Sequence, residues 1–211
     1  FSQMRLRSIA SAVALAFFVA GCSSGSGGAG GSSGLVPAPL PLTTAEIFDN
    51  NSKSFDAIEA RLLARSNTAF DGMPTAGIAT FEGNAYIYVD TAPAISELAG
   101  DSRIVINFAD GTMSGQFDKF VGKDQDGVLD SYTGKLDIVS GTVGEFVPNN
   151  IFIDYDGALQ GNGDTITMSG YVDGKFKGTP IRGIVANDRG RAVDLNGGAT
   201  IASLWVVAEK K

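Results

Sequence analysis

The chain has 211 residues, 44% of them hydrophobic, and a formal net charge of −7. This length and apolar content suit one main domain with a sizeable core, and an acidic surface repels phosphate backbones, so nucleic acid is not an expected partner. The sequence has no histidine and one cysteine, Cys22, which excludes an internal disulfide, Ser-His and Cys-His nucleophile pairs and the commonest zinc ligand. We therefore expect a protein that is not an enzyme and that carries no cofactor.

Residues 1–21 have the pattern of an export signal. A basic start with Arg5 and Arg7 precedes an apolar run over 9–20, which is short for a bilayer span. The run ends in Val-Ala-Gly-Cys, and this tetrapeptide resembles a bacterial lipobox; an ordinary secretory signal that contains a cysteine is the alternative. The resemblance implies a lipid on Cys22 and a membrane-anchored protein. With Ser23 following the cysteine, it also implies an outer-membrane location, on the surface or on the periplasmic face.

Residues 22–42 are expected to be a tether. The stretch 23–34 is nearly pure glycine and serine, a composition that buries too little surface to order itself. The stretch 35–42 contains three prolines and is expected to be a stiffer, extended spacer. A tether directly after a lipid anchor would hold a folded domain away from the membrane.

Residues 43–70 are expected to form a helical segment. Thr43 and Glu46 have the spacing of a capping box. The apolar side chains recur on one helical face at Phe48, Phe55, Ile58 and Leu62. The run Asn50-Asn51-Ser52 suggests two helical pieces, and a plug or lid on the following domain is the simplest role, with a partner-binding helix as the alternative.

From residue 77 onward the hydrophobic period changes to two, which predicts strands for the domain at 71–211. Eight are expected, at Gly77–Asp90, Ser102–Ala109, Thr112–Phe120, Tyr132–Val143, Asn149–Gln160, Thr165–Lys177, Ile181–Asn187 and Ala199–Ala208. Short strands with hairpin-length links favour an all-β fold, an eight-stranded antiparallel up-and-down β-barrel with a short N-terminal helix, because closure leaves no exposed edge. An open sandwich is the alternative.

The hairpin over 103–117 shows the pattern most clearly. Ile104, Ile106 and Phe108 share one face of the first strand. Asp110-Gly111 predicts a two-residue type I′ turn, in which both central residues have positive φ.

Three segments of this domain look familiar: residues 73–83, residues 107–117, and residues 170–178, which contain Gly-x-Phe-x-Gly. They resemble, in this order, the opening, the second hairpin and a strand end of the barrel of transferrin-binding protein B-like lipoproteins. The resemblance implies an eight-stranded barrel on a lipid-anchored envelope protein, in a family whose known members bind host proteins. Unlike the transferrin receptors proper, this chain has room for one barrel only, and no transferrin-contacting residue can be matched in it.

Acidic loop residues are the candidate recognition sites. Asp124, Asp126 and Asp130 lie in an Asp-x-Asp-Gly stretch suggestive of a calcium loop, but an EF-hand would need acidic residues at Gly122 and Thr133, so no metal is expected. We expect the loops 91–101 and 121–131 to present Glu97 and these three aspartates to a protein partner.

Other constellations have ordinary structural explanations. Asp154 and Asp156 share a strand face and could suggest a glycosidase pair, but outward-facing polar residues are the simpler explanation. Trp205 is expected in the closing strand, with an exposed binding anchor as the alternative. The leading functional hypothesis is a protein-binding module, and the alternative is a lipocalin-like carrier with a small apolar ligand in the barrel.

Overall fold

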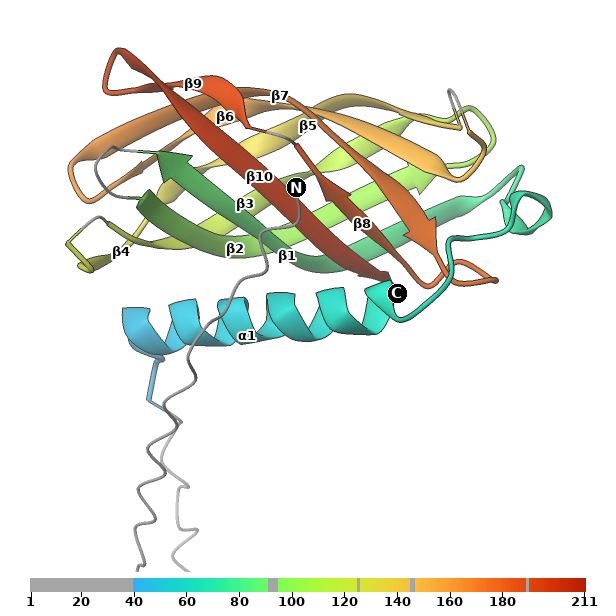
Figure 1. Cartoon of the computed structure of the whole chain (residues 1–211), viewed down its shortest axis with the longest axis horizontal. Coiled ribbons are helices and arrows are strands. Elements are labelled where there is room, and N and C mark those ends of the chain that lie inside the picture. The colour runs from blue at the N-terminus through green and yellow to red at the C-terminus, as the bar shows by residue number, and fades with distance from the viewer. Residues whose placement is uncertain (1–39, 91–94, 125, 145–146, 189) are drawn as a thin grey trace, which may run out of the picture. The chain divides into compact units, whose positions relative to one another are not determined.

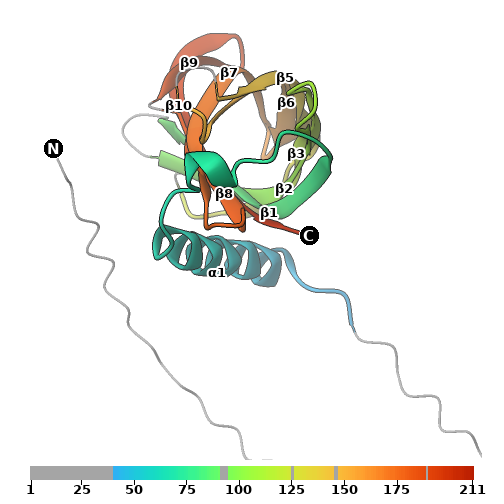
Figure 2. The ribbon, with the colours of Figure 1, turned by 90° about the vertical axis from the view of Figure 1, so that its right-hand side faces the viewer.

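The first strand of the domain pairs with the last, and this pairing closes the sheet into a barrel (Figures 1 and 2). The computed structural model describes residues 40–90, 95–124, 126–144, 147–188 and 190–211. The signal segment, Cys22 and most of the tether therefore lie outside the described residues. All neighbouring strands are antiparallel, so the prediction of a closed, eight-stranded antiparallel barrel preceded by one helix is confirmed.

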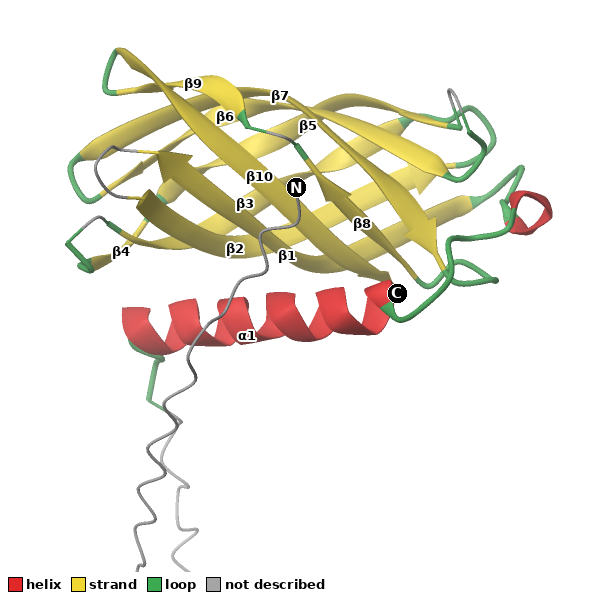
Figure 3. Ribbon diagram, in the orientation of Figure 1, coloured by secondary structure: helices red, strands yellow, loops and turns green. Residues whose placement is uncertain are grey.

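Ten strand segments build the eight wall strands (Figure 3). They are β1 (Ile78–Asp90), β2 (Ile95–Asn107), β3 (Met113–Lys123), β4 (Leu129–Ser131), β5 (Thr133–Val143), β6 (Asn150–Gly161), β7 (Asp164–Lys177), β8 (Gly183–Asn187), β9 (Arg191–Leu195) and β10 (Gly198–Lys210). β4 and β5 both pair with β3 and form one interrupted wall strand. β8 and β9 both pair with β7 and β10 and form another. The sequence analysis missed β4, β9 and the first half of β2, which it had assigned to loops.

The predicted alternation is observed, and one face of each strand fills the barrel. On β2 Ile104 and Ile106 are fully buried while Arg103 is exposed. The interior is closed by large side chains from opposite walls, including the ring pair Phe81 and Phe176, whose centroids lie 6.0 Å apart. A contiguous side-chain core therefore runs through the barrel.

The hairpin between β2 and β3 differs from the predicted type I′ turn. The amide of Asn107 donates to Thr112 O (2.9 Å) and the amide of Gly111 donates to Asn107 O (2.8 Å), so four residues rather than two form the loop. Gly111 has a φ of 74°, but Asp110 does not have positive φ. Instead, the Asp110 carboxylate accepts hydrogen bonds from the amide (2.9 Å) and hydroxyl (2.7 Å) of Thr112, which stabilises the longer loop.

Helix α1 (Thr44–Leu63) is continuous, contrary to the expected break at 50–52. The capping box is present, because the Glu46 amide donates to Thr43 Oγ1 (3.3 Å) and the Thr43 amide donates to Glu46 Oε2 (2.8 Å). Its buried face packs on the outer wall over β1, β2, β8 and β10 (Figure 1). The helix is therefore a lateral cover, and the prediction of a plug or lid is wrong.

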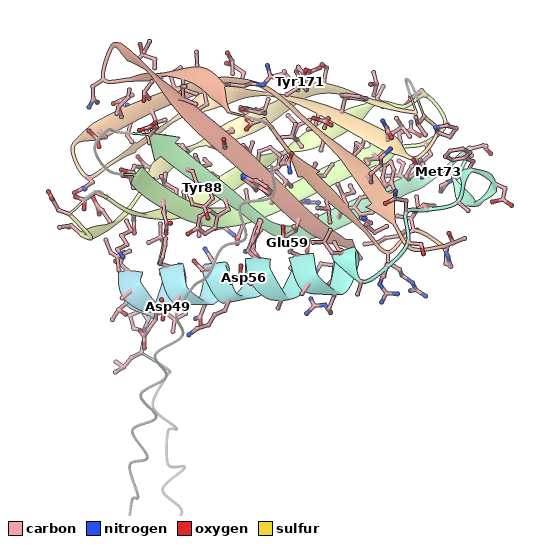
Figure 4. The ribbon with its side chains drawn as sticks, viewed as in Figure 1. Asp49, Asp56, Glu59, Met73, Tyr88 and Tyr171 are labelled. Carbon is pink, nitrogen blue, oxygen red and sulfur yellow. The ribbon has the colours of Figure 1, made fainter. Side chains whose placement is uncertain are left out.

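The segment between α1 and β1 is fixed to one end of the barrel. Thr68 is fully buried, its amide donates to Phe176 O (2.9 Å) and its hydroxyl donates to Gly178 O (2.7 Å). Asn149 Nδ2 donates to Thr68 O (2.7 Å). Further along, Met73 packs against the core at this end (Figure 4). This connecting segment, rather than the helix, covers the barrel end next to β7.

Candidate functional site

A polar groove lies between α1 and the outer faces of β1, β2 and β3, and we call it the α1 groove. It has a volume of about 750 Å3. Most of its charges are neutralised by one another: Lys119 pairs with Asp101 (2.9 Å) and Lys211 pairs with Glu82 (3.3 Å). Asn84 lies in its lining, 5% exposed, and donates to Gly100 O (3.3 Å), while its Oδ1 has no hydrogen-bond partner. Opposite charges are therefore paired within the α1 groove, and the groove does not present a concentrated charge of one sign to a ligand.

A second feature is a gap in the hydrogen-bonding of the wall between β7 and the interrupted strand β8–β9. β7 pairs with β8 over Asp173–Lys177 and with β9 at Ile166 and Thr167, and the described residues between these stretches form no such pairs. The side chain of Arg191 crosses the gap. Its Cδ lies 2.6 Å from where a Cβ on Gly170 would be placed, so only glycine at that position leaves room for the arginine stem.

The guanidinium of Arg191 emerges over the ring of Tyr171, with Cζ 3.8 Å from the ring centroid. Phe152 lies beside this ring, with a centroid distance of 6.2 Å. A pocket of about 360 Å3 is lined by these three residues together with Asp173 and Gly190, and we call it the Arg191 pocket. Tyr171 lies on the side of the barrel away from α1 (Figure 4), so the Arg191 pocket and the α1 groove are separate surfaces.

A buried carboxylate fixes the backbone from which Arg191 extends. Asp188, 3% exposed, accepts hydrogen bonds from Tyr155 Oη (2.9 Å), the Leu204 amide (2.9 Å) and the Gly190 amide (3.2 Å). Burial raises the pKa of Asp188, although the hydrogen bonds and the positive charge of Arg191 oppose this effect. Burial likewise raises the pKa of Tyr155. The hydrogen bonds that Asp188 accepts from the Leu204 and Gly190 amides hold the chain against β10 between the end of β8 and the start of β9.

The predicted acidic loop is shorter than expected, because its ends belong to β3 and β4. Asp124 Oδ1 accepts hydrogen bonds from the amides of Asp126 (2.9 Å) and Val128 (2.7 Å), and its other oxygen accepts one from the Asn162 side chain. Asp130 accepts from the Asn162 amide (2.7 Å). Two of the three aspartates therefore tie this loop to the β6–β7 turn.

Desolvation opposes ionisation of Asp124, but its hydrogen bonds from Asn162 and from the loop backbone outweigh that effect and lower its pKa. The carboxylate thus has an internal structural role. Among the three, Asp126 is the one whose side chain has no hydrogen bond or ion pair within the described residues. Whether any of them contacts a partner stays a prediction.

Glu97 does not lie in a loop. It belongs to β2, opposite Tyr88 on β1 and Lys123 on β3, and it accepts a hydrogen bond from Tyr86 Oη (3.0 Å). The loop assignment was wrong because the alternation over 95–101 is masked by small residues, Ser96, Ala99 and Gly100. Residues 91–94 of the expected loop lie outside the described residues.

The other candidates singled out in the sequence have the structural roles expected for wall residues. Asp154 and Asp156 face outward on β6, as predicted, and Asp154 accepts a hydrogen bond from Ser140. Trp205 lies in β10, as predicted, and packs in the cluster under α1, so it is not an exposed anchor. These residues do not converge on one site.

The sequence analysis missed the Arg191 pocket. Residues 188–198 were left between two predicted strands because they are rich in Asn, Asp and Gly, and this hid the alternation of Val193 and Leu195 in β9. The outward alternation of Tyr171 and Asp173 on β7 was visible. The sequence pattern does not show that the pairing of β7 with β8 and β9 stops between Thr167 and Asp173, or that Arg191 crosses this gap.

The fold defines the chain as an eight-stranded antiparallel β-barrel protein with one N-terminal helix on its outer wall. Comparison with protein-family models and with curated proteins identified no match. Among the described residues, no three acidic or cysteine side chains come together in a way that could hold a metal ion. The one long helix that the structure describes is not apolar enough to cross a membrane.

Proposed function

We propose that this chain is a lipid-anchored envelope lipoprotein whose barrel is a protein-binding module of the transferrin-binding protein B-like type. The lipobox-like sequence at Cys22 and the Gly/Ser tether support the anchor, and the barrel is the fold that the resemblance implies. The outer membrane is the proposed location. Capture of a host protein or of an iron carrier is the proposed role, by analogy with that family.

The observation that carries the binding role is the contrast between the inside and the outside of the barrel. Inside, side chains from all the wall strands form one contiguous core, in which Phe81, Phe117 and Phe176 are fully buried. Outside, the Arg191 pocket combines two aromatic rings with an arginine. Tyrosine, phenylalanine and arginine are enriched at protein interfaces, and tyrosine and arginine also at their energetic centres.

The filled interior does not favour the alternative of a lipocalin-like carrier. A barrel of eight strands either is filled by its own side chains or holds one small ligand. Here the ring of Phe176 packs against those of Phe81 and Phe108, at centroid distances of 6.0 and 5.9 Å, at the barrel end next to the segment that contains Thr68. An apolar ligand that entered from this end would have to displace these rings.

The test is capture of a protein partner by the purified full chain, compared with two variants. Tyr171→Ser removes an aromatic ring that is 40% exposed, and Val139→Ser removes a side chain that is 61% exposed on β5 as the matched control. We expect a protein retained by the wild type and by the control but not by Tyr171→Ser. A chain that captures no protein, and that instead takes up a fluorescent apolar probe with quenching of its interior tyrosines, would establish the carrier.

The anchor is tested separately, with labelled palmitate and envelope fractionation. The wild type should incorporate label and fractionate with the outer membrane, and Cys22→Ala should do neither. Label in Cys22→Ala would show that the lipid, if any, is attached elsewhere.

A further inference from the structure

The guanidinium of Arg191 is held in place, and its charge acts on the buried carboxylate of Asp188, but it forms no ion pair within the described residues. Its position is fixed by the stem that crosses the wall gap beside Gly170 and by stacking on Tyr171 at 3.8 Å. No hydrogen bond or ion pair joins it to any described residue, and its Nε is buried without a partner. Arg61 and Arg103 differ, since they pair with Glu209 (2.9 Å) and Glu82 (4.0 Å).

This geometry leaves the terminal Nη donors of the guanidinium without a partner among the described residues, whereas Nε is buried. The Tyr171 ring covers one side of the group. The N–H donors of a guanidinium lie in its plane, and a pair of them matches the two oxygens of a carboxylate. Because the stem and the ring already hold the group, little side-chain freedom is lost when a ligand binds. The same pocket offers Phe152 and Tyr171 as an aromatic surface for an apolar group next to the carboxylate.

The surrounding charges select the kind of carboxylate. Asp173 lines the same pocket and forms no ion pair with Arg191, and Asp154 lies opposite Tyr171 on the same outer face. These carboxylates repel a small free anion. A peptide segment can complement both charges of the pocket. Its acidic side chain can bind Arg191 while a neighbouring basic side chain lies near the two aspartates.

We propose that the Arg191 pocket binds an acidic side chain of a protein partner, with a neighbouring apolar residue on the Phe152–Tyr171 surface and a basic residue near Asp173. This inference rests on the proposed binding function and specifies the surface and chemistry of recognition. It concerns residues that the sequence analysis had not assigned to any site.

The test uses the purified full chain and two probe peptides, N-acetyl-Phe-Glu-Lys-amide and N-acetyl-Phe-Gln-Lys-amide, followed by amide chemical shifts. The peptides have the same shape and differ in one negative charge. Since a charge-assisted hydrogen bond contributes about tenfold to a hundredfold in affinity, the Glu peptide should bind roughly tenfold or more tightly. It should also shift the amide signals of Gly190 and Tyr171.

Three variants locate the effect. Arg191→Met keeps the apolar stem that fills the gap but removes the guanidinium, and it should abolish the preference for the Glu peptide. Arg103→Met, on the α1 groove, is the matched control and should leave the preference unchanged. Tyr171→Leu changes only an outward side chain, so it remains informative if Arg191→Met fails to fold, and it should weaken binding of the Glu peptide.

The proposal is overturned if the two peptides bind the wild type equally, if neither binds, or if the preference survives in Arg191→Met. Sodium acetate that competes as well as the Glu peptide would reduce the pocket to a simple anion site and would also overturn it. A protein partner captured by the full chain, but equally well by Arg191→Met, would refute this inference and leave the proposed function standing.

Discussion

The hydroxyl of Tyr155 donates a hydrogen bond of 2.9 Å to the carboxylate of Asp188 inside the barrel wall. Both groups are almost completely buried, Tyr155 at 1% and Asp188 at 3% exposure. The carboxylate also receives two amide hydrogen bonds, from Leu204 and Gly190. Asp188 therefore joins β6 and β10 just beyond the end of β8, where the wall strand β8–β9 is interrupted.

The first prediction concerns the charge of Asp188. Because burial raises its folded pKa above the ordinary value of 3.8, the ionised carboxyl is disfavoured in the folded state, and its contribution to stability decreases as the pH rises through the folded pKa. Asp188→Asn carries no such titration. The stability of the wild type relative to Asp188→Asn should therefore be greatest below the ordinary pKa of 3.8 and should decrease as the pH rises toward neutral.

Denaturant unfolding of both proteins at a series of pH values measures this difference. Using the difference between the two proteins removes the titration of the other carboxylates, which they share. A difference that grows with pH would mean that the folded pKa of Asp188 is lowered rather than raised.

The second prediction concerns alkaline unfolding. Burial, followed by the nearby charges of Asp164, Asp124 and Asp130, raises the pKa of Tyr132 from 10.0 to about 12. The neutral phenol of Tyr132 contributes its full stabilisation below pH 10. This contribution is lost as the pH rises to about 12, because the phenol ionises at a lower pH in the unfolded state than in the folded state. Tyr132→Phe should therefore lose less stability over this interval than the wild type.

Ultraviolet absorbance of tyrosinate and circular dichroism, recorded together, check this point. In the wild type, part of the tyrosine titration should coincide with unfolding. If the two proteins lose stability in parallel above pH 10, Tyr132 is not the group responsible.

The third prediction compares two phenylalanines of the same hairpin. Phe117 is fully buried in the barrel, so Phe117→Ala should cost roughly 3–5 kcal/mol of unfolding free energy. The sequence pattern placed Phe108 in the same class, but it lies just beyond β2 and is only partly buried, so Phe108→Ala should cost about 1–3 kcal/mol. Equal losses in the two variants would contradict the difference in burial.

The fourth prediction separates two loop aspartates. Asp124→Ala leaves the Asp126 and Val128 amides and the Asn162 side chain without their acceptor, so it should lower the melting temperature by several degrees. Asp126→Ala, which removes no hydrogen bond of its own side chain, should leave the melting temperature nearly unchanged. The two variants are matched in chemistry and lie two positions apart, so each is the control for the other.

The same melting experiment tests for a metal. A metal that binds only the folded state raises its melting temperature, so a chelator would lower it. With the Asp124 oxygens already accepting hydrogen bonds, we expect chelator to leave the melting of the wild type unchanged.

The sequence predicted the barrel because its signals are local. Alternation such as Ile151, Ile153 and Tyr155 in β6 requires only the strand period, and the capping box of Thr43 and Glu46 requires only a spacing of three. Closure followed from the number of strands and the short links between them.

The candidate pocket could not be predicted, because it depends on relations between distant residues. That Gly170 leaves room for the Arg191 stem depends on the register of β7 against an interrupted neighbour, and no local pattern encodes that register. For the same reason, the sequence pattern did not separate β9 from a long connection between two predicted strands. Glu97 illustrates the reverse error, since small residues in a real strand were taken for a loop.

The pairing of β1 with β10 has a consequence for how the chain folds. These strands lie at opposite ends of the domain sequence, yet Phe81 pairs with Lys210 and α1 packs over both strands. The barrel seam cannot form until the last strand has been synthesised. Contacts of such long sequence separation slow folding, and until they form β1 and β8 each present an open edge that can pair with another chain. A chain that ends before β10 would therefore be an aggregation-prone open sheet rather than a smaller version of the same domain.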